Sequence, residues 1–412
     1  MIEITGKYGT AKIYVKDEEH LDEATRSQIY DIMNSKAVEG SQIRIMSDCH
    51  SGKGVCIGFT QKLPKENPRV VPSFVGCDIG CGVLVVKLDG KKVKELFGHE
   101  EGLKRLDKIV RERIPLGMKA RTKLHKFSEK VHLENIRCPI NINKAKYNIG
   151  SAGSGNHYLE LDVDSEGNYY LNVHSGSRHL GIEIESYYTK KAKEYHANCS
   201  KEKSDLIAKL KAEGREKDIQ AELSKLKNPE SVPSHLAYLE GDLLEDYLND
   251  MKWAQEYAVW NREAMIDEIL EAFKLRKAVL DKFCTIHNYI DIEDGIVRKG
   301  AISLEKDEKA IIPMNMADGC LIVKGKGNED WNRSGPHGAG RLYSRSAAKE
   351  KLKMEDFKES MKGIYTTSVS ASTIDESKMA YKPMQDIIDN IQDTCEIITR
   401  ITPVWNVKAG EE

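Results

Sequence analysis

The residues able to do chemistry gather in six short segments of the sequence. Five of the six place histidine, cysteine or aspartate near glycine, which lets the backbone turn sharply or approach a ligand closely, and the sixth contains cysteine and histidine without glycine. Histidine, cysteine and aspartate are also the side chains that hold transition metals. In chain order the segments cover residues 46–54, 75–82, 149–160, 173–179, 284–289 and 332–341. Their residue types indicate metal or phosphate chemistry.

The second segment contains the first pair of candidate metal ligands. Asp78 and Cys81 lie three residues apart in the glycine-rich sequence VGCDIGCG, so both side chains could reach one ion. The alternative is structural, because cysteine is commonly a buried apolar residue and aspartate commonly caps a turn. Taken by itself, this segment favours the structural alternative.

Four histidines in the other segments extend the candidate set. His157 follows the Gly/Ser loop IGSAGSGN, whose main-chain N–H groups could bind an anion, although the loop matches neither common phosphate-binding motif. His174 begins HSGSR, where Arg178 could form paired hydrogen bonds to a phosphate. His287 begins HNY, and His337 lies in HGAGR. A lone histidine is more often structural than catalytic, but four beside an Asp–Cys turn favour a functional site.

Composition restricts the class of protein. The chain has 412 residues, of which 40% are hydrophobic and 31% charged, so it is not collagen-like, mucin-like or wholly disordered. The net charge of −2 argues against coating nucleic acid by bulk charge but leaves a local basic groove open. With no apolar run of roughly 18 residues and no secretory signal pattern, we expect a cytoplasmic protein that does not contact membranes. The nine cysteines are expected to be thiols or metal ligands.

Strands and helices must position these segments. Residues 83–88 and 168–174 are predicted strands. In the second strand alternate side chains would share a face, with Tyr169, Leu171 and Val173 on one side and Tyr170, Asn172 and His174 on the other.

A long central region, residues 186–283, is predicted to be a helical insertion within one domain of residues 1–412. Residues 200–228 are highly charged and indicate two solvated helices that are broken near Gly214. Residues 239–283 have helical spacing of apolar residues, which we interpret as core rather than as a cofactor site. This stripe consists of Tyr247, Met251, Ala254 and Ala258.

Together the six segments resemble a known family. The motifs DxxCG, GxGNH, HSGSR, HNY and HGAGR occur in this order, and the set is similar to that of the RtcB-type RNA ligases. Each motif is weak alone, but the ordered set is highly specific and runs from about Asp48 to Lys408. The resemblance implies a mixed α/β (α+β) fold with a single catalytic domain and a central cleft that contains metal.

The resemblance also implies roles for individual residues. Two Mn²⁺ ions would share Cys81, the first also binding His157 and His174 and the second Asp78 and His287. His337 matches the histidine that carries GMP. The other implied positions are Asp48, Arg178 and Lys299 for catalysis, and Asn156, Glu160, Asn315, Gly338, Gly340 and Lys408, with His337, for nucleotide binding.

The implied reaction joins RNA ends. GTP would guanylylate the histidine, GMP would pass to an RNA 3′-phosphate, and the 5′-hydroxyl of a second RNA would displace GMP. A 2′,3′-cyclic phosphate would first be opened at the same centre. The donor set alone suits Mn²⁺, Co²⁺ or Zn²⁺, and the resemblance favours Mn²⁺. The expected partners are therefore GTP, Mn²⁺ and RNA with these ends, while the need for an activating protein is open.

Two alternatives to the ligase remain open, and departures from the family pattern support the first of them. Asn315 stands where many members have serine, Pro336 where cysteine is common, and Cys77 where valine is common, which suggests a bacterial subgroup. The first alternative is a dinuclear metal phosphoesterase acting on RNA ends, with His337 as general acid. The second is a non-catalytic RNA-end binder whose basic stretch 119–126 contacts phosphates, although such a charge run is usually a solvated face.

Overall fold

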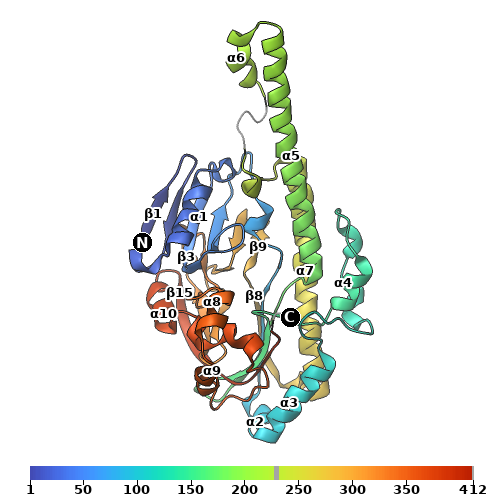
Figure 1. Ribbon diagram of the computed structural model, residues 1–412. Coiled ribbons are helices and arrows are strands. Elements are labelled where there is room, and N and C mark those ends of the chain that lie inside the picture. Colours follow the sequence, from blue (N-terminus) through green and yellow to red (C-terminus); the bar gives the residue numbers. More distant parts are fainter. Residues whose placement is uncertain (227–231, 411–412) are drawn as a thin grey trace.

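The computed structural model describes residues 1–226 and 232–410 and has a mixed α/β architecture, which confirms the expected fold class (Figure 1). Its larger sheet has seven strands in antiparallel order, β12 (Lys309–Asn315), β13 (Gly319–Gly325), β15 (Cys395–Lys408), β6 (Tyr158–Val163), β7 (Tyr169–Ser175), β5 (Gly82–Leu88) and β8 (Val279–Ile286).

A second sheet has six strands, in the order β1 (Ile2–Thr5), β2 (Thr10–Ile13), β3 (Gln42–His50), β4 (Ile57–Lys62), β10 (Ile296–Lys299) and β9 (Asn288–Asp291). Strands β2 and β3 pair in parallel, whereas the other neighbours pair antiparallel. A short ribbon joins β11 (Ala301–Ser303) to β14 (Ser334–Pro336).

Helices surround these sheets, and two of them are long. They are α1 (Glu23–Met33), α2 (Gly90–Phe97), α3 (Glu100–Arg113), α4 (Ile142–Asn148), α5 (His179–Ala212), α6 (Ile219–Leu223), α7 (Gly241–Ala272), α8 (Arg345–Lys351), α9 (Met354–Ser360) and α10 (Met384–Asn390). Figure 1 shows α5 projecting beyond the sheets and carrying α6 at its end. Within the described residues, no helix combines the length and the apolarity that crossing a membrane requires.

The two strands expected near the candidate ligands are confirmed to within a residue at each end, as β5 and β7. The predicted alternation of β7 is also confirmed. Tyr169, Leu171 and Val173 pack in one hydrophobic core. On the other face Tyr170 joins a different core, and Asn172 hydrogen-bonds the side chain of Asp162. This second face therefore presents His174 to the candidate site.

The central helical region is partly as expected. The chain breaks after α5 at Gly214, whose φ of +70° suits glycine. Residues 227 and 228, the last two of the predicted pair of charged helices, lie outside the described residues. The prediction of helix through residue 283 is wrong, because α7 ends at Ala272 and residues 279–286 form β8. Half-buried Val279 and Phe283 alternate with exposed neighbours there, which is the period of a strand. The insertion within one domain stays a prediction.

Helix α7 connects the two largest hydrophobic cores. Its N-terminal half packs with α5 and the six-stranded sheet, and its C-terminal half packs with α2, α3 and the seven-stranded sheet. The predicted apolar stripe of Tyr247, Met251, Ala254 and Ala258 is buried, so its interpretation as core is confirmed.

Two polar residues of α7, Asn261 and Arg262, fix the loops that carry the candidate ligands. The side chain of Asn261 accepts from the main-chain N–H groups of residues 150 and 151 and donates to Ser151 O, Gly176 O and Ser175 Oγ. Arg262 donates from Nη1 to the carbonyls of Gly80 and Ser175, at 2.6 Å each. Both side chains are fully buried. One turn of α7 therefore satisfies main-chain groups in three separate loops.

We expect Asn261→Ala to destabilise the protein by about 2–4 kcal/mol, because it leaves several buried main-chain groups unpaired. Urea unfolding followed by circular dichroism measures this free energy. The matched control is Asn249→Ala on the same helix, where the amide is partly exposed and bonds Asn135 O and Asp250 Oδ1. If Asn261→Ala lowers the free energy of unfolding no more than Asn249→Ala does, the anchoring role of Asn261 is contradicted.

Candidate metal centre and adjoining cavity

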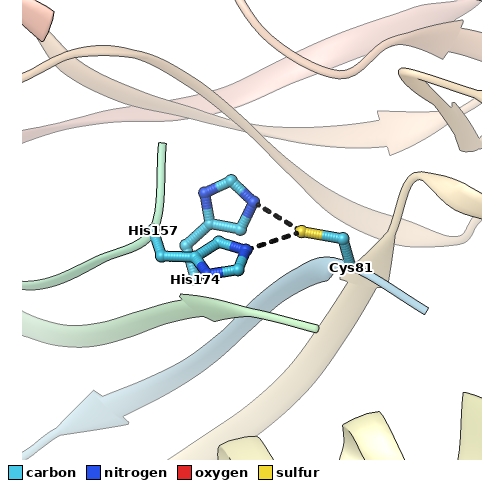
Figure 2. A group of neighbouring side chains, drawn as sticks. All are labelled: Cys81, His157 and His174. Carbon is cyan, nitrogen blue, oxygen red and sulfur yellow. Dashed lines mark hydrogen bonds between the residues drawn. The ribbon is translucent and has the colours of Figure 1, made fainter. Parts of the chain in front are cut away.

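Cys81 lies at the centre of a buried group of potential metal ligands (Figure 2). Its Sγ is 3.3 Å from Nε2 of His157 and 3.3 Å from Nε2 of His174. Nε2 of His157 is also 2.8 Å from Oδ2 of Asp78. Nε2 of His174 is 3.3 Å from Nε2 of His287. All five residues that the sequence singled out as metal ligands are thus brought together.

Sheet topology explains this convergence. β6, β7, β5 and β8 are antiparallel neighbours, so the beginnings of β6 and β5 lie at the same edge as the ends of β7 and β8. His157 and Cys81 directly precede β6 and β5, while His174 is the penultimate residue of β7 and His287 directly follows β8. Four histidine or cysteine side chains therefore meet at one edge of the sheet.

Two glycines keep room for these side chains. A Cβ on Gly176 would lie 2.2 Å from Oδ1 of Asp78. A Cβ on Gly153, which has φ of +100°, would lie 2.4 Å from Nδ1 of His157 and 2.1 Å from Nη1 of Arg178. Larger residues at either position would displace candidate ligands, which explains why these segments are glycine-rich.

The electrostatics of the group fit a divalent cation. Burial lowers the pKa of His174 and His287 well below the usual range, so both rings are neutral and can offer a lone pair. Burial alone would raise the pKa of Asp78, but the adjacent His157 ring holds that pKa below its usual range. Burial raises the pKa of the Cys81 thiol, which a cation would reverse.

The positions of the donor atoms fit a metal as well. The ligand atoms of Cys81, His157 and His174 all lie within 4.8 Å of one another. Nδ1 of His157 is buried and has no hydrogen-bond partner among the described residues. Imidazoles and a thiol that face each other at these distances are the donor set of a borderline transition metal.

His337 lies beside this group and is oriented by Asp48. The ring centroids of His337 and His287 are 4.8 Å apart. Oδ2 of the fully buried Asp48 accepts from Nδ1 of His337 at 2.7 Å and from its main-chain N–H at 3.1 Å. With its proton on Nδ1, the ring keeps the lone pair of Nε2 available for attack on an electrophile.

We call Asp78, Cys81, His157, His174 and His287 the metal-type group. A cavity of about 260 Å³ adjoins His337 and this group. His174 and His337 line it, so the two features are continuous. The cavity also brings together six residues that the sequence assigned to nucleotide binding, namely Asn156, Glu160, Asn315, Gly338, Gly340 and Lys408. Asn315 Oδ1 is partly engaged, because it accepts from the main-chain N–H groups of residues 317 and 318.

The wall of the cavity carries buried charges. Nζ of Lys408 donates to Oε2 of Glu376 at 2.5 Å. Burial would raise the pKa of Glu376, but Lys408 and two arginines hold it below its usual range. Burial raises the pKa of Glu160 to about 7, and Oε2 of Glu160 accepts from the amide of Asn406 at 3.2 Å. The cavity therefore offers both a fixed cation and a carboxyl group that titrates near neutrality.

Arg178 and Lys299, the other two predicted catalytic residues, do not line the cavity. Arg178 lies at the edge of the metal-type group, where Nη2 donates to Gly117 O at 2.9 Å and Nε to Ser151 Oγ at 3.3 Å. The Nζ of Lys299 donates to the carbonyls of Lys53 and Ser73, at 2.5 and 2.7 Å. Burial lowers the pKa of Lys299 to about 8. These contacts tie Lys299 to two loops rather than to the cavity.

Several residues that shape the site were not predicted from the sequence. Asn261 and Arg262 lie within a helix, without glycine or histidine nearby, and only their complete burial identifies them. Arg341 and Arg345 bind Glu376 across the cavity wall. Arg341 ends the HGAGR motif and was therefore within reach of sequence analysis, whereas Glu376 has no motif that would have marked it.

Comparison with known proteins gives these features a family. The sequence matches the family model described as tRNA-splicing ligase RtcB over residues 28–138 and 138–409. RNA-splicing ligase RtcB of Escherichia coli (strain K12) is 29% identical over 399 residues, covering 89% of this chain and 90% of the relative. tRNA-splicing ligase RtcB of Archaeoglobus fulgidus is 25% identical over 457 residues, covering 91% and 89%. Because the family model spans nearly the whole chain, the protein belongs to the RtcB family.

Proposed function

We propose that this protein is a GTP- and Mn²⁺-dependent RNA ligase that joins RNA 3′-phosphate or 2′,3′-cyclic phosphate ends to 5′-hydroxyl ends. The observation that carries the proposal is the position of His337, with Nδ1 held by Asp48 and Nε2 available, between a metal-type group and a cavity. Membership of the RtcB family and the names of the E. coli and A. fulgidus relatives support RNA joining as the reaction.

In the proposed first step Nε2 of His337 attacks the α-phosphorus of GTP. A P–N bond forms, the bond from the α-phosphorus to the bridging oxygen breaks, and pyrophosphate leaves. The ring becomes positively charged, and the carboxylate of Asp48, which already accepts from Nδ1–H, stabilises that charge. The geometry of the two side chains therefore prepares both the lone pair and the compensating charge before the reaction.

The metal-type residues have a matching role. Cys81, His157 and His174 would hold one Mn²⁺, and Asp78, Cys81 and His287 the other. Mn²⁺ held there would supply Lewis-acid stabilisation of the phosphate oxygens. Arg178, whose Nη1 faces Gly153 at the edge of the group, would add a second positive charge to the phosphate.

The cavity would hold the nucleotide. Glu160 as a carboxylate offers two acceptor oxygens, which suit the adjacent N–H donors of guanine, and Lys408 offers a donor for the guanine carbonyl. GMP would then pass from His337 to an RNA 3′-phosphate, and the 5′-hydroxyl of the second RNA would displace GMP and seal the joint. A 2′,3′-cyclic phosphate would be hydrolysed first.

We expect His337→Ala to abolish the covalent GMP adduct, because no other described residue of the cavity combines an available ring nitrogen with a carboxylate partner. Wild-type and variant proteins are incubated with MnCl₂ and α-labelled GTP, denatured and examined for label that is acid-labile and alkali-resistant. His132→Ala changes an exposed histidine and serves as the matched control. Label on His337→Ala, or no label on metal-loaded wild type with either GTP or ATP, would refute the adduct and favour the phosphoesterase alternative.

We expect Cys81→Ser to weaken Mn²⁺ binding strongly, because Cys81 contacts both flanking histidines. Loss of a residue that only hydrogen-bonds a metal ligand weakens binding roughly 10- to 100-fold, and the loss here should be larger. Titration calorimetry and the metal content after dialysis measure the change. Cys284→Ser removes an exposed thiol from β8 and should bind as wild type does. Wild-type Mn²⁺ affinity in Cys81→Ser would show that the cation is held elsewhere.

We expect the KM for GTP in adduct formation to rise as the pH falls through about 7. Burial raises the pKa of Glu160 to about 7, so its carboxylate, which would accept from guanine, is present above that pH and lost below it. The measurement is made at saturating MnCl₂, and Glu160→Gln is compared as a variant that cannot titrate. If the KM of Glu160→Gln still depends on pH, the dependence arises from a group other than Glu160.

A further inference from the structure

A strongly basic segment lies beside the candidate metal centre. Residues 113–150 contain nine lysines and arginines in total and only two acidic residues, both glutamates. The whole chain, by contrast, has a net charge of −2. The basic residues are Arg113, Lys119, Arg121, Lys123, Lys126, Lys130, Arg137, Lys144 and Lys146. The segment ends with α4, which Figure 1 shows next to α7 on the side opposite β8 and β9.

Ion pairs divide these basic residues into two groups. Arg121 pairs with Glu268, Lys126 with Asp267 and Arg137 with Asp246, each at 2.5 Å, so their charges are compensated. Lys119, Lys123 and Lys144 are exposed, and no ion pair involves them within residues 1–226 and 232–410. The free positive charge of the segment is therefore concentrated on a few of its lysines.

The uncompensated lysines are close to exposed apolar side chains. The main-chain N–H of Arg121, midway between Lys119 and Lys123, donates to the carbonyl of Tyr147 at 3.0 Å. Lys144 lies one helical turn before Tyr147, so the two side chains share a face of α4. Tyr147 is 39% exposed and Met118 is 83% exposed. We call Met118, Lys119, Lys123, Lys144 and Tyr147 the lysine–tyrosine surface.

This surface continues directly into the candidate metal centre. Gly117, the residue before Met118, donates from its main-chain N–H to Gly153 O and accepts from Nη2 of Arg178, at 2.9 Å each. Gly153 belongs to the loop that leads into His157 and packs against that ring. A chain bound on this surface would therefore lie next to Arg178 and the loop that carries His157.

We propose that the lysine–tyrosine surface binds the single-stranded RNA that flanks the end being joined. Lysines would pair with its phosphates, and the exposed ring of Tyr147 would stack on a base, which is how single strands are held without sequence preference. The inference rests on the proposed function, because it takes the RNA end to lie at the metal centre. The exposed aromatic ring and the continuity with Arg178 favour RNA over an acidic protein partner.

The test measures the affinity for a fluorescein-labelled single-stranded RNA by anisotropy over a range of KCl concentrations. In Lys119→Gln/Lys123→Gln, loss of two phosphate contacts lowers the slope of log affinity against log salt by about 1.4, because each contact on a single strand contributes about 0.7. Tyr147→Leu weakens binding by roughly 5- to 150-fold, as loss of one stacked base would, and leaves the slope unchanged.

The matched control removes the same charge from compensated positions. Lys126 and Arg276 both pair with Asp267 and Glu271, so Lys126→Gln/Arg276→Gln should keep the wild-type slope. Wild-type affinity and slope in Lys119→Gln/Lys123→Gln, or an equal loss in the control pair, would overturn the proposal. The first of these results would also be found if the surface bound an acidic protein.

A second readout separates this inference from the proposed function. Adduct formation from GTP needs no RNA, so all these variants should form the GMP adduct at the wild-type rate. Loss of RNA affinity with normal adduct formation supports the surface. If wild-type protein forms no adduct, the proposed ligase mechanism fails, while the anisotropy measurement still decides whether this surface binds RNA.

Discussion

The site depends on one turn of α7, which carries two fully buried polar side chains. Asn261 and Arg262 of α7 bind main-chain groups of the loops that carry Cys81, His157 and Arg178. These loops leave the sheet to form the site, so their polar groups lack strand partners and need other ones. A buried amide and a guanidinium supply those partners without adding a side chain to the site itself. Because α7 belongs to both large cores, packing throughout the molecule supports this turn.

On this support, two arrangements of functional residues meet. The antiparallel order of β6, β7, β5 and β8 brings the metal-type residues to one edge of the larger sheet. β3 supplies Asp48, and the segment after β14 supplies His337. Since the rings of His287 and His337 lie 4.8 Å apart, the proposed nucleophile faces the proposed metal site. Phosphate activation and nucleophilic attack would thus both occur where the two sheets meet.

The residues of the site can be predicted from the sequence better than the residues that hold its loops in place. Glycine-flanked histidines and the Asp78–Cys81 turn could be recognised because their chemistry restricts residue type, and β7 because its period-2 pattern is visible in the sequence. The helix was wrongly extended through Phe283 because half-buried residues of β8 also fit a helical stripe over a short window. Glu376 and Asn261 could not be found, since their roles arise from contacts with residues far away in the chain. Likewise, only the structure shows that Lys126 forms an ion pair, whereas Lys119 and Lys123 form none with the described residues.

The central claim is that a metal held around Cys81 and a nucleotide held on His337 occupy one continuous site. Diffraction from crystals grown with MnCl₂ and GTP, recorded at the manganese absorption edge, tests it most directly. We expect anomalous density among Cys81, His157 and His174 and continuous density from Nε2 of His337 to a phosphorus atom. Manganese bound away from these residues, or a nucleotide attached at Nδ1 or to another residue, would contradict it.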